Sequence, residues 1–280
     1  MPVGELYETM YRQPRHFSFG QNWRVFLTSM NQERLKNAEA SLTDFLGGKR
    51  QLTNKSFIDV GCGSGLFSLS AYRLGAAEVL SIDVDRQSLA CAKQLRQEAG
   101  SPPNWRIEKG SALDANYLAR LGRFDVVYSW GVLHHTGNMY QAITNVCRLV
   151  KPGGRLFLAI YNDSGSWLHG RSTFWLGFKR AYNRAPAVGK VIAFQLYRAY
   201  LFLGILASGR NPLNYVRNYV SNRGMSWHHD ILDWLGGYPY QFASPETIIN
   251  LVAKEGFGCQ KLVSRNGIGC NEYLFIKNHG

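Results

Sequence analysis

A glycine-rich segment followed by an acidic residue is the clearest chemical motif in the sequence. Residues 59–65 are D-V-G-C-G-S-G, and Asp83 ends the next predicted strand, 22 positions after Gly61. Glycines let the backbone turn tightly and approach a ligand, and a carboxylate at the end of a second strand can accept hydrogen bonds from ribose hydroxyls. A carboxylate at Asp59 disfavours a pyrophosphate and suits a ligand that carries positive charge. The motif therefore favours S-adenosylmethionine, which has a sulfonium and an ammonium group.

Two groups of histidines could do chemistry beside such a cofactor. His134 and His135 follow the fourth predicted strand, at the edge where parallel sheets bind ligands. A hydroxyl acceptor usually needs a general base, most often histidine, so His135 and then His134 are candidates. The alternative is that the pair only shapes the loop under the cofactor. His229, with Asp230 as an orienting carboxylate, is a second candidate base.

The segment around His229 mixes titratable groups, aromatics and glycines, as substrate-binding loops often do. The substrate contacts predicted from it are Arg223, Met225, Ser226, His228, Trp234 and Tyr240. The alternative is a folded connector with its tryptophans in the core. The spacing of its histidines and aspartates is loose for a metal, so no metal site is predicted.

The elements that would position these residues alternate between strands and helices. Short apolar runs predict strands at 57–60, 79–83, 105–108, 124–129, 155–161, 260–263 and 273–276. Helical spacing covers 26–46, 88–99, 139–149 and 245–255, with stops at Gly47-Gly48 and a turn at 152–154. This alternation predicts a mostly parallel, helix-covered sheet.

Segment 57–85 (FIDVGCGSGLFSLSAYRLGAAEVLSIDVD) closely resembles the first two motifs of class I S-adenosylmethionine-dependent methyltransferases. Segments 110–114 (GSALD), 124–135 (FDVVYSWGVLHH) and 149–154 (LVKPGG) resemble later motifs in order and spacing. The resemblance covers residues 57–161 and favours the small-molecule type. It implies an α/β fold with a Rossmann-like, doubly wound, seven-stranded sheet. The sheet would be mostly parallel, with an antiparallel C-terminal strand and a helical insert.

The resemblance also implies roles for individual residues. The methionine end of the cofactor would be lined by Asp59, Gly61, Gly63, Ser64 and Gly65. Asp83 would hold the ribose, and the adenine would lie against Val84, Ser111 and Ala112. The family often has an acidic residue where this chain has Ser111, which puts a carboxylate contact to the adenine in doubt. Trp130 would begin the loop beside the sulfonium, and the segment around Trp23 would form a lid or simply pack on the sheet.

The charge is concentrated in one segment. The 280 residues carry 32 Lys and Arg against 19 Asp and Glu, a net charge of +13. Residues 164–229 contain nine basic residues and no acidic one, so the other 214 residues contribute only +4. This aromatic, basic segment predicts a cap over the acceptor, a contact with an anionic membrane surface, or, third, an RNA-binding surface. The predicted divisions are 1–48 (lid), 49–163 (core), 164–240 (cap) and 241–280 (C-terminal strands).

Several classes of protein are disfavoured. The hydrophobic share of 45% predicts a full core rather than disorder, and five cysteines without a CxxC pair argue against disulfide scaffolds and zinc ribbons. Residues 1–15 lack a signal-peptide pattern, and Gln195 and Arg198 interrupt a short apolar run at 191–207, which argues against a transmembrane helix. A cytoplasmic protein is predicted, with peripheral membrane contact as one of the open alternatives.

The function predicted from the sequence is methyl transfer from S-adenosylmethionine to a small-molecule acceptor. Oxygen is the preferred acceptor atom because of the available histidines. Nucleic acid is disfavoured as a partner, since no N-P-P-[YF] motif follows the fourth strand and no Pro-Cys pair is present. The alternatives are an RNA or protein methyltransferase and a non-catalytic cofactor-binding protein.

Overall fold

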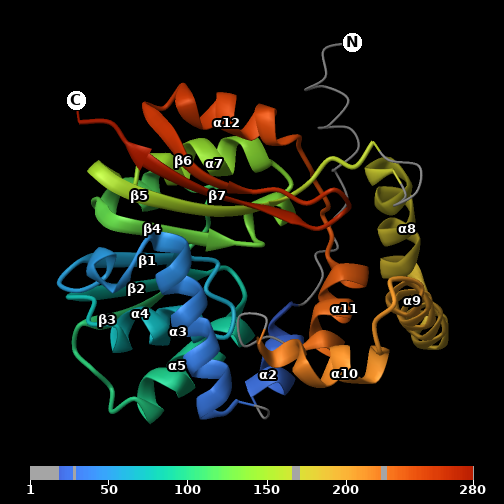
Figure 1. Cartoon of the computed structure of the whole chain (residues 1–280). Helices are drawn as coiled ribbons and strands as arrows, with labels where there is room; N and C mark the ends of the chain where they lie inside the picture. The colour runs from blue at the N-terminus through green and yellow to red at the C-terminus, as the bar shows by residue number, and fades with distance from the viewer. Residues whose placement is uncertain (1–18, 28–29, 166–170, 222–225, 280) are drawn as a thin grey trace.

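The chain forms one seven-stranded sheet with helices on both faces (Figure 1). The computed structural model describes residues 19–27, 30–165, 171–221 and 226–279. The strand order is β3-β2-β1-β4-β5-β7-β6, and β7 runs antiparallel to both of its neighbours while the other neighbouring pairs are parallel. The strands are β1 (Ser56–Val60), β2 (Glu78–Asp83), β3 (Trp105–Lys109), β4 (Phe124–Trp130), β5 (Val150–Tyr161), β6 (Phe257–Val263) and β7 (Cys270–Lys277). The predicted fold class is confirmed.

Two hydrophobic clusters, one on each face, hold the helices to the sheet. One face carries α3 (Gln32–Leu46), α4 (Leu66–Arg73) and α5 (Arg86–Glu98). The other face carries α6 (Ala115–Arg120), α7 (Met139–Cys147) and α12 (Pro245–Ala253). The strands between them are buried on both sides, which explains why they are continuous apolar runs in the sequence.

Two local predictions were wrong in detail. The helical pattern at 26–46 is two helices, α2 (Phe19–Leu27) and α3, because the Asn31 side chain accepts a hydrogen bond from Arg34 N at 2.9 Å and starts a new helix. The turn predicted at 152–154 lies inside β5, where the register against β4 shifts and Gly153 has a φ of +70°. The stop at Gly47 is confirmed, with a left-handed φ of +86°.

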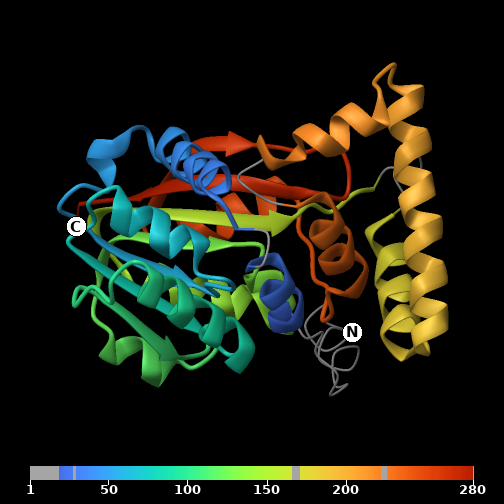
Figure 2. The same cartoon turned by 90° about the horizontal axis from the view of Figure 1, so that it is seen from below.

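A helical cap stands beyond the carboxyl ends of the parallel strands (Figures 1 and 2). It contains α8 (Ser172–Arg184), α9 (Ala187–Ala207), α10 (Pro212–Arg217), the short η3 (Asn218–Ser221) and α11 (Trp227–Gly236). The sequence predicts an irregular segment where α11 lies, and this prediction was wrong. Ile231 and Leu235, one helical turn apart, are buried against α8 and α9, and this packing outweighs the mixed local pattern.

Helix α9 is longer than the apolar run that argued against a membrane span. It has 21 residues and starts at Ala187, and by length and composition alone it could cross a membrane. Only 6% of its most apolar window is buried inside the protein. A core helix of this composition would be mostly buried, so the exposure of α9 needs its own explanation.

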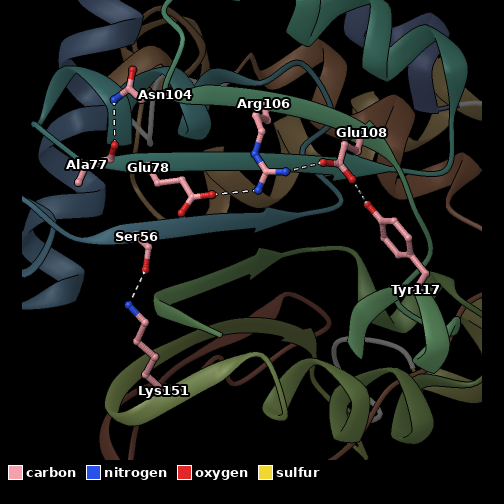
Figure 3. A network of polar contacts seen from close by, with 8 residues as sticks. All are labelled: Ser56, Ala77, Glu78, Asn104, Arg106, Glu108, Tyr117 and Lys151. Atoms are coloured by element: carbon pink, nitrogen blue, oxygen red, sulfur yellow. Dashed lines mark hydrogen bonds and ion pairs between the residues drawn. The ribbon is translucent and has the colours of Figure 1, made fainter. Parts of the chain in front are cut away.

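Charged pairs protect the edge of the sheet at β3 (Figure 3). Arg106 donates to Glu78 on β2 and to Glu108 on its own strand, at 2.9 Å each, and Tyr117 Oη donates to Glu108 at 3.1 Å. A charged edge resists pairing with another chain. At the start of β1, next to Glu78 in the register of the two strands, Ser56 Oγ accepts a hydrogen bond from Lys151 at 3.1 Å.

Candidate functional site

The glycine loop after β1 has a backbone that only glycine adopts easily. Gly61 and Gly63 have φ values of +79° and +53°, and a Cβ at either position would collide with a neighbouring side chain. At Gly63 that neighbour is the Trp23 indole, 2.8 Å from the Cβ position. Gly63 N also donates to Asp83 Oδ2 at 3.0 Å, which ties the loop to the end of β2.

A chain of buried hydrogen bonds fixes Asp59 at the end of β1. Trp105 Nε1 donates to Ser81 Oγ at 2.8 Å, Ser81 Oγ donates to Ser68 Oγ at 2.7 Å, and Ser68 Oγ donates to Asp59 Oδ2 at 2.6 Å. Burial raises the pKa of Asp59 to about 7, helped by the nearby charge of Asp83, although the bond from Ser68 opposes the shift. Burial also raises the pKa of Asp83, against the backbone bonds that it accepts.

The carboxylates of Asp59 and Asp83 make the surroundings of the loop electronegative. Neither forms an ion pair with a basic side chain among the described residues. A bound cation next to a buried carboxylate would lower its pKa and favour the ionised form. S-adenosylmethionine carries positive charge on its sulfonium and its ammonium, so the residues present fit this cofactor.

The predicted adenine contacts lie next to Asp83 in the fold. Gly110 N donates to Asp83 O at 3.0 Å, which places Ser111 and Ala112 beside the end of β2. The Val84 side chain is 59% exposed there, so its apolar surface is accessible to a planar group such as the adenine. Their contacts with the cofactor stay predictions, as does the role of the buried Ser64.

Helix α2 covers the glycine loop. Besides the contact of Trp23 with Gly63, a Cβ on Gly20 would collide with Asp85 Oδ1, so α2 packs closely on the N-terminus of α5. The Phe26 ring, fully buried, meets Trp23 at 5.5 Å and His229 of α11 at 5.9 Å between ring centroids. This position supports the predicted lid, whose residues 1–18 lie outside the described part.

The loop after β4 contacts the glycine loop through Val132. A Cβ on Gly61 would collide with the Val132 side chain. Trp130 Nε1 instead donates to Glu272 Oε1 on β7 at 3.0 Å, which turns the indole across the sheet. A contact of Trp130 with the sulfonium therefore gains no support from its hydrogen bonding. Sequence reasoning missed Val132, because an isolated valine carries no chemical signal.

The two histidines after β4 have different environments. His135 is half-buried, and its Nδ1 lies 2.6 Å from Pro239 O. Because a carbonyl only accepts, Nδ1 carries the proton and the neutral ring keeps its Nε2 lone pair. His134 is fully buried, its Nδ1 accepts from Tyr161 N at 3.3 Å, and burial holds its pKa well below the usual value. His135 thus has the tautomer of a base, and His134 is a neutral part of the wall.

A fully buried lysine of the basic segment lies beside these histidines, whereas the sequence predicts an outward-facing role for the cations of the cap. Lys179 of α8 donates to Trp234 O near the end of α11. Its Nζ lies 4.0 Å from the Trp234 ring centroid, 4.8 Å from that of Tyr240 and 5.7 Å from that of Tyr161. Burial holds the pKa of Lys179 well below its usual value. Lys179 therefore connects α8 to the aromatic wall formed by Tyr161, Trp234 and Tyr240, and it does not lie in solvent.

The predicted site residues of α11 have different neighbours at the two ends of the helix. His229 Nδ1 lies 2.9 Å from Ser226 Oγ, and Asp230 accepts from Tyr219 Oη at 2.8 Å. These two hydrogen bonds join His229 and Asp230 to different neighbours, so the predicted pairing of His229 with Asp230 gains no support. His228 is exposed against Phe194, whereas Trp234 and Tyr240 line the aromatic wall. Arg223 and Met225 lie outside the described residues. No group of three possible metal ligands occurs in the part that the structure describes.

Comparison with known proteins identifies the class of this domain. Residues 58–158 match the family model described as a methyltransferase domain. With the observed sheet order and loop, this shows a class I S-adenosylmethionine-dependent methyltransferase domain.

The similar curated proteins are named as enzymes of one kind. One is the ubiquinone biosynthesis O-methyltransferase of Xanthomonas oryzae pv. oryzae (strain PXO99A), 34% identical over 42% of this chain and 48% of that protein. Another, from Methylobacterium sp. (strain 4-46), is 32% identical over 41% and 44%. The chain thus spans about half the length of the curated relatives it matches.

Solved structures agree on the fold. The magnesium protoporphyrin IX methyltransferase of Synechocystis PCC 6803 with bound SAH has a TM-score of 0.51 at 16% identity, over 99% of this chain and 95% of that one. A putative S-adenosylmethionine-dependent methyltransferase from Listeria monocytogenes has a TM-score of 0.51 at 14% identity, over 86% and 98%. At such identities the likeness concerns the fold alone.

Proposed function

We propose that this protein transfers a methyl group from S-adenosylmethionine to an oxygen atom of a small, lipophilic acceptor held under the cap. The observation that carries the oxygen preference is His135, whose Nδ1 is fixed on Pro239 O, so that Nε2 is the basic nitrogen. The names of the relatives in ubiquinone biosynthesis support an oxygen acceptor. The aromatic wall of Tyr161, Trp234 and Tyr240 supports a lipophilic one.

The reaction needs alignment more than activation. The cofactor supplies a methyl group on a sulfonium, which is already a good leaving group. His135 Nε2 would accept the proton of the acceptor hydroxyl while its oxygen takes the methyl group, and the cofactor would leave as a neutral thioether. Ionised Asp59 and Asp83, which Ser68 and Gly63 N fix in place, would hold the cofactor's positive end and its ribose. Trp23 and Val132 pack against Gly63 and Gly61 of the loop.

The test separates cofactor binding from catalysis. Binding of S-adenosylmethionine is measured by calorimetry, and turnover by transfer of tritiated methyl to phenols and catechols with increasingly long alkyl chains. We expect His135→Gln to bind the cofactor normally and to lose about 100-fold or more in turnover. The matched control, His134→Gln, should keep most of its turnover. Asp83→Ala should weaken cofactor binding itself.

Each negative result has a distinct meaning. If the wild-type protein binds no S-adenosylmethionine, the proposed reaction is wrong altogether. If it binds the cofactor and methylates none of the acceptors, it acts as a cofactor-binding protein or on another acceptor class. If His135→Gln keeps full turnover, the assignment of the base is wrong. RNA or protein methylation is the alternative function, and the apolar outer surface of the cap disfavours RNA. The cytoplasmic location and the domain boundaries stay predictions.

A further inference from the structure

Helix α9 has two apolar faces, and only one of them is covered. Phe194 is buried, and Ala193, Tyr197 and Leu201 pack with it against α8 and α11. On the other face, large apolar side chains at helical spacing are each more than half exposed: Val188, Val191, Ile192, Leu196, Leu203 and Leu206. Figure 2 shows α9 along the outer edge of the molecule, away from the sheet. An exposed apolar stripe at such a position, interrupted only by Gln195 among the described residues of this face, marks an interaction surface.

Exposed basic side chains also occur on the helices of the cap that lie around this stripe in the sequence. Four arginines are exposed there: Arg184 of α8, Arg198 of α9, Arg210 of the turn before α10, and Arg217 of α10. Residues 164–229 contain no Asp or Glu. Apolar side chains on a helix that is flanked by arginines are typical of elements that bind at an anionic lipid surface.

We propose that the outer face of α9 docks on the surface of an anionic membrane, with the helix lying in the plane of the interface. The inner face already packs on α8 and α11, so a perpendicular, membrane-crossing α9 would have to expose Phe194 and its neighbours. The arginines on the rim would lie at the level of the lipid headgroups. This docking does not depend on which acceptor the protein methylates.

The charge also disfavours the other occupants. Two copies of this chain packed through α9 would bring exposed arginines together without an acidic residue from 164–229 between them. Nucleic acid would be attracted by the arginines, but the leucines and valines on the stripe offer no planar group for base stacking. An anionic bilayer satisfies both the apolar stripe and the basic rim.

The full chain is tested by co-sedimentation with vesicles of phosphatidylcholine alone and with one third phosphatidylglycerol. We expect binding to the anionic vesicles that is at least about tenfold stronger than to the neutral ones. Binding should weaken markedly at about 1 M salt, where the screening length is about 3 Å. Leu196→Glu should reduce binding to anionic vesicles about tenfold or more.

The matched control is Leu262→Glu, which places the same charge on an exposed leucine of β6, outside the cap. It should leave vesicle binding unchanged, and both variants should keep the wild-type thermal midpoint. The proposal is overturned if the protein does not bind anionic vesicles or if the two variants bind them equally well. It is also overturned if alkaline carbonate fails to release the bound protein from the vesicles, because a membrane-spanning helix would resist such extraction. It is also overturned if sedimentation velocity reveals a dimer that Leu196→Glu dissociates.

Discussion

Replacing Asp59 by asparagine should make the cofactor-free protein more stable and the cofactor bind less tightly. The carboxyl has a pKa of about 7 in the folded protein because it is buried, against 3.8 when exposed. The folded state therefore binds more protons than the unfolded state between these values, and stability falls as pH rises through this window. The whole difference corresponds to about 4 kcal/mol above pH 7, an upper bound. The asparagine side chain would carry no charge and would still accept the bond from Ser68.

Cofactor binding should depend on pH in the opposite sense. If the positive end of S-adenosylmethionine requires the ionised carboxylate, only about a tenth of the protein is competent at pH 6, and nearly all of it is at pH 8. The apparent dissociation constant should therefore be about tenfold larger at pH 6. Asp59→Asn should bind more weakly than the wild type at pH 8, and its affinity should vary less with pH.

The measurements are chemical unfolding without cofactor at pH 5, 6.5 and 8, and calorimetric titration at pH 6, 7 and 8. Asp125→Asn is a control of opposite sign, because hydrogen bonds from Lys151 and Ser56 outweigh partial burial and lower the pKa of Asp125 to about 2. That variant should be less stable than the wild type at every pH above this value. A less stable Asp59→Asn protein at pH 8, or an affinity constant between pH 6 and 8, would refute the reasoning.

Three further changes test other parts of the site. Lys179→Met should stabilise the protein near pH 7, because the buried lysine must either keep a desolvated charge or give up its proton. Because burial lowers the pKa of Lys179, the folded state binds fewer protons than the unfolded state. The stability of the wild type should therefore rise as pH approaches 10.5, and the stability advantage of Lys179→Met should shrink. Thermal melts over this pH range measure both trends, and an advantage that grows with pH would contradict the argument. Gly63→Ala should weaken cofactor binding at least about tenfold, because φ at this position is +53° and the added Cβ would collide with Trp23. In a double-mutant cycle, Trp23→Ala should restore part of the lost affinity, and strictly additive effects would argue against the contact between Gly63 and Trp23. The acid limb of the pH–rate profile should persist in His134→Gln, because the low pKa of His134 keeps it neutral; its disappearance would reverse the two assignments.

The sheet could be predicted because its strands are short apolar runs that end in recognisable turns. β1, β2 and β3 are each within one residue of the predicted ranges. Helix boundaries were predicted less well where a capping side chain or tertiary packing decides them. Asn31 divides one apparent helix into two, and the packing of Ile231 and Leu235 makes a helix of a segment with mixed local signals.

The cofactor side of the site was likewise more predictable than the acceptor side. Glycines with positive φ and a carboxylate at a strand end are needed whatever surrounds them, so Gly61, Gly63 and Asp83 could be found from residue type and spacing. The wall of the acceptor side is assembled from α8, α11 and the end of β5, which are far apart in sequence. No local pattern links Tyr161 to Trp234, whose ring centroids lie 5.0 Å apart.

The basic, aromatic composition of the cap conceals two opposite roles. Lys179 has the same formal charge as Arg198, but it is fully buried against aromatic rings near His134, while Arg198 is exposed. Composition adds these charges together, whereas the fold assigns one to the inner wall and the other to the outer surface. The inner wall lines the proposed acceptor site, and the outer surface makes the proposed membrane contact. A change on one face should therefore leave the other property intact: Leu196→Glu should affect vesicle binding without altering turnover on a water-soluble acceptor, and Lys179→Met should do the reverse.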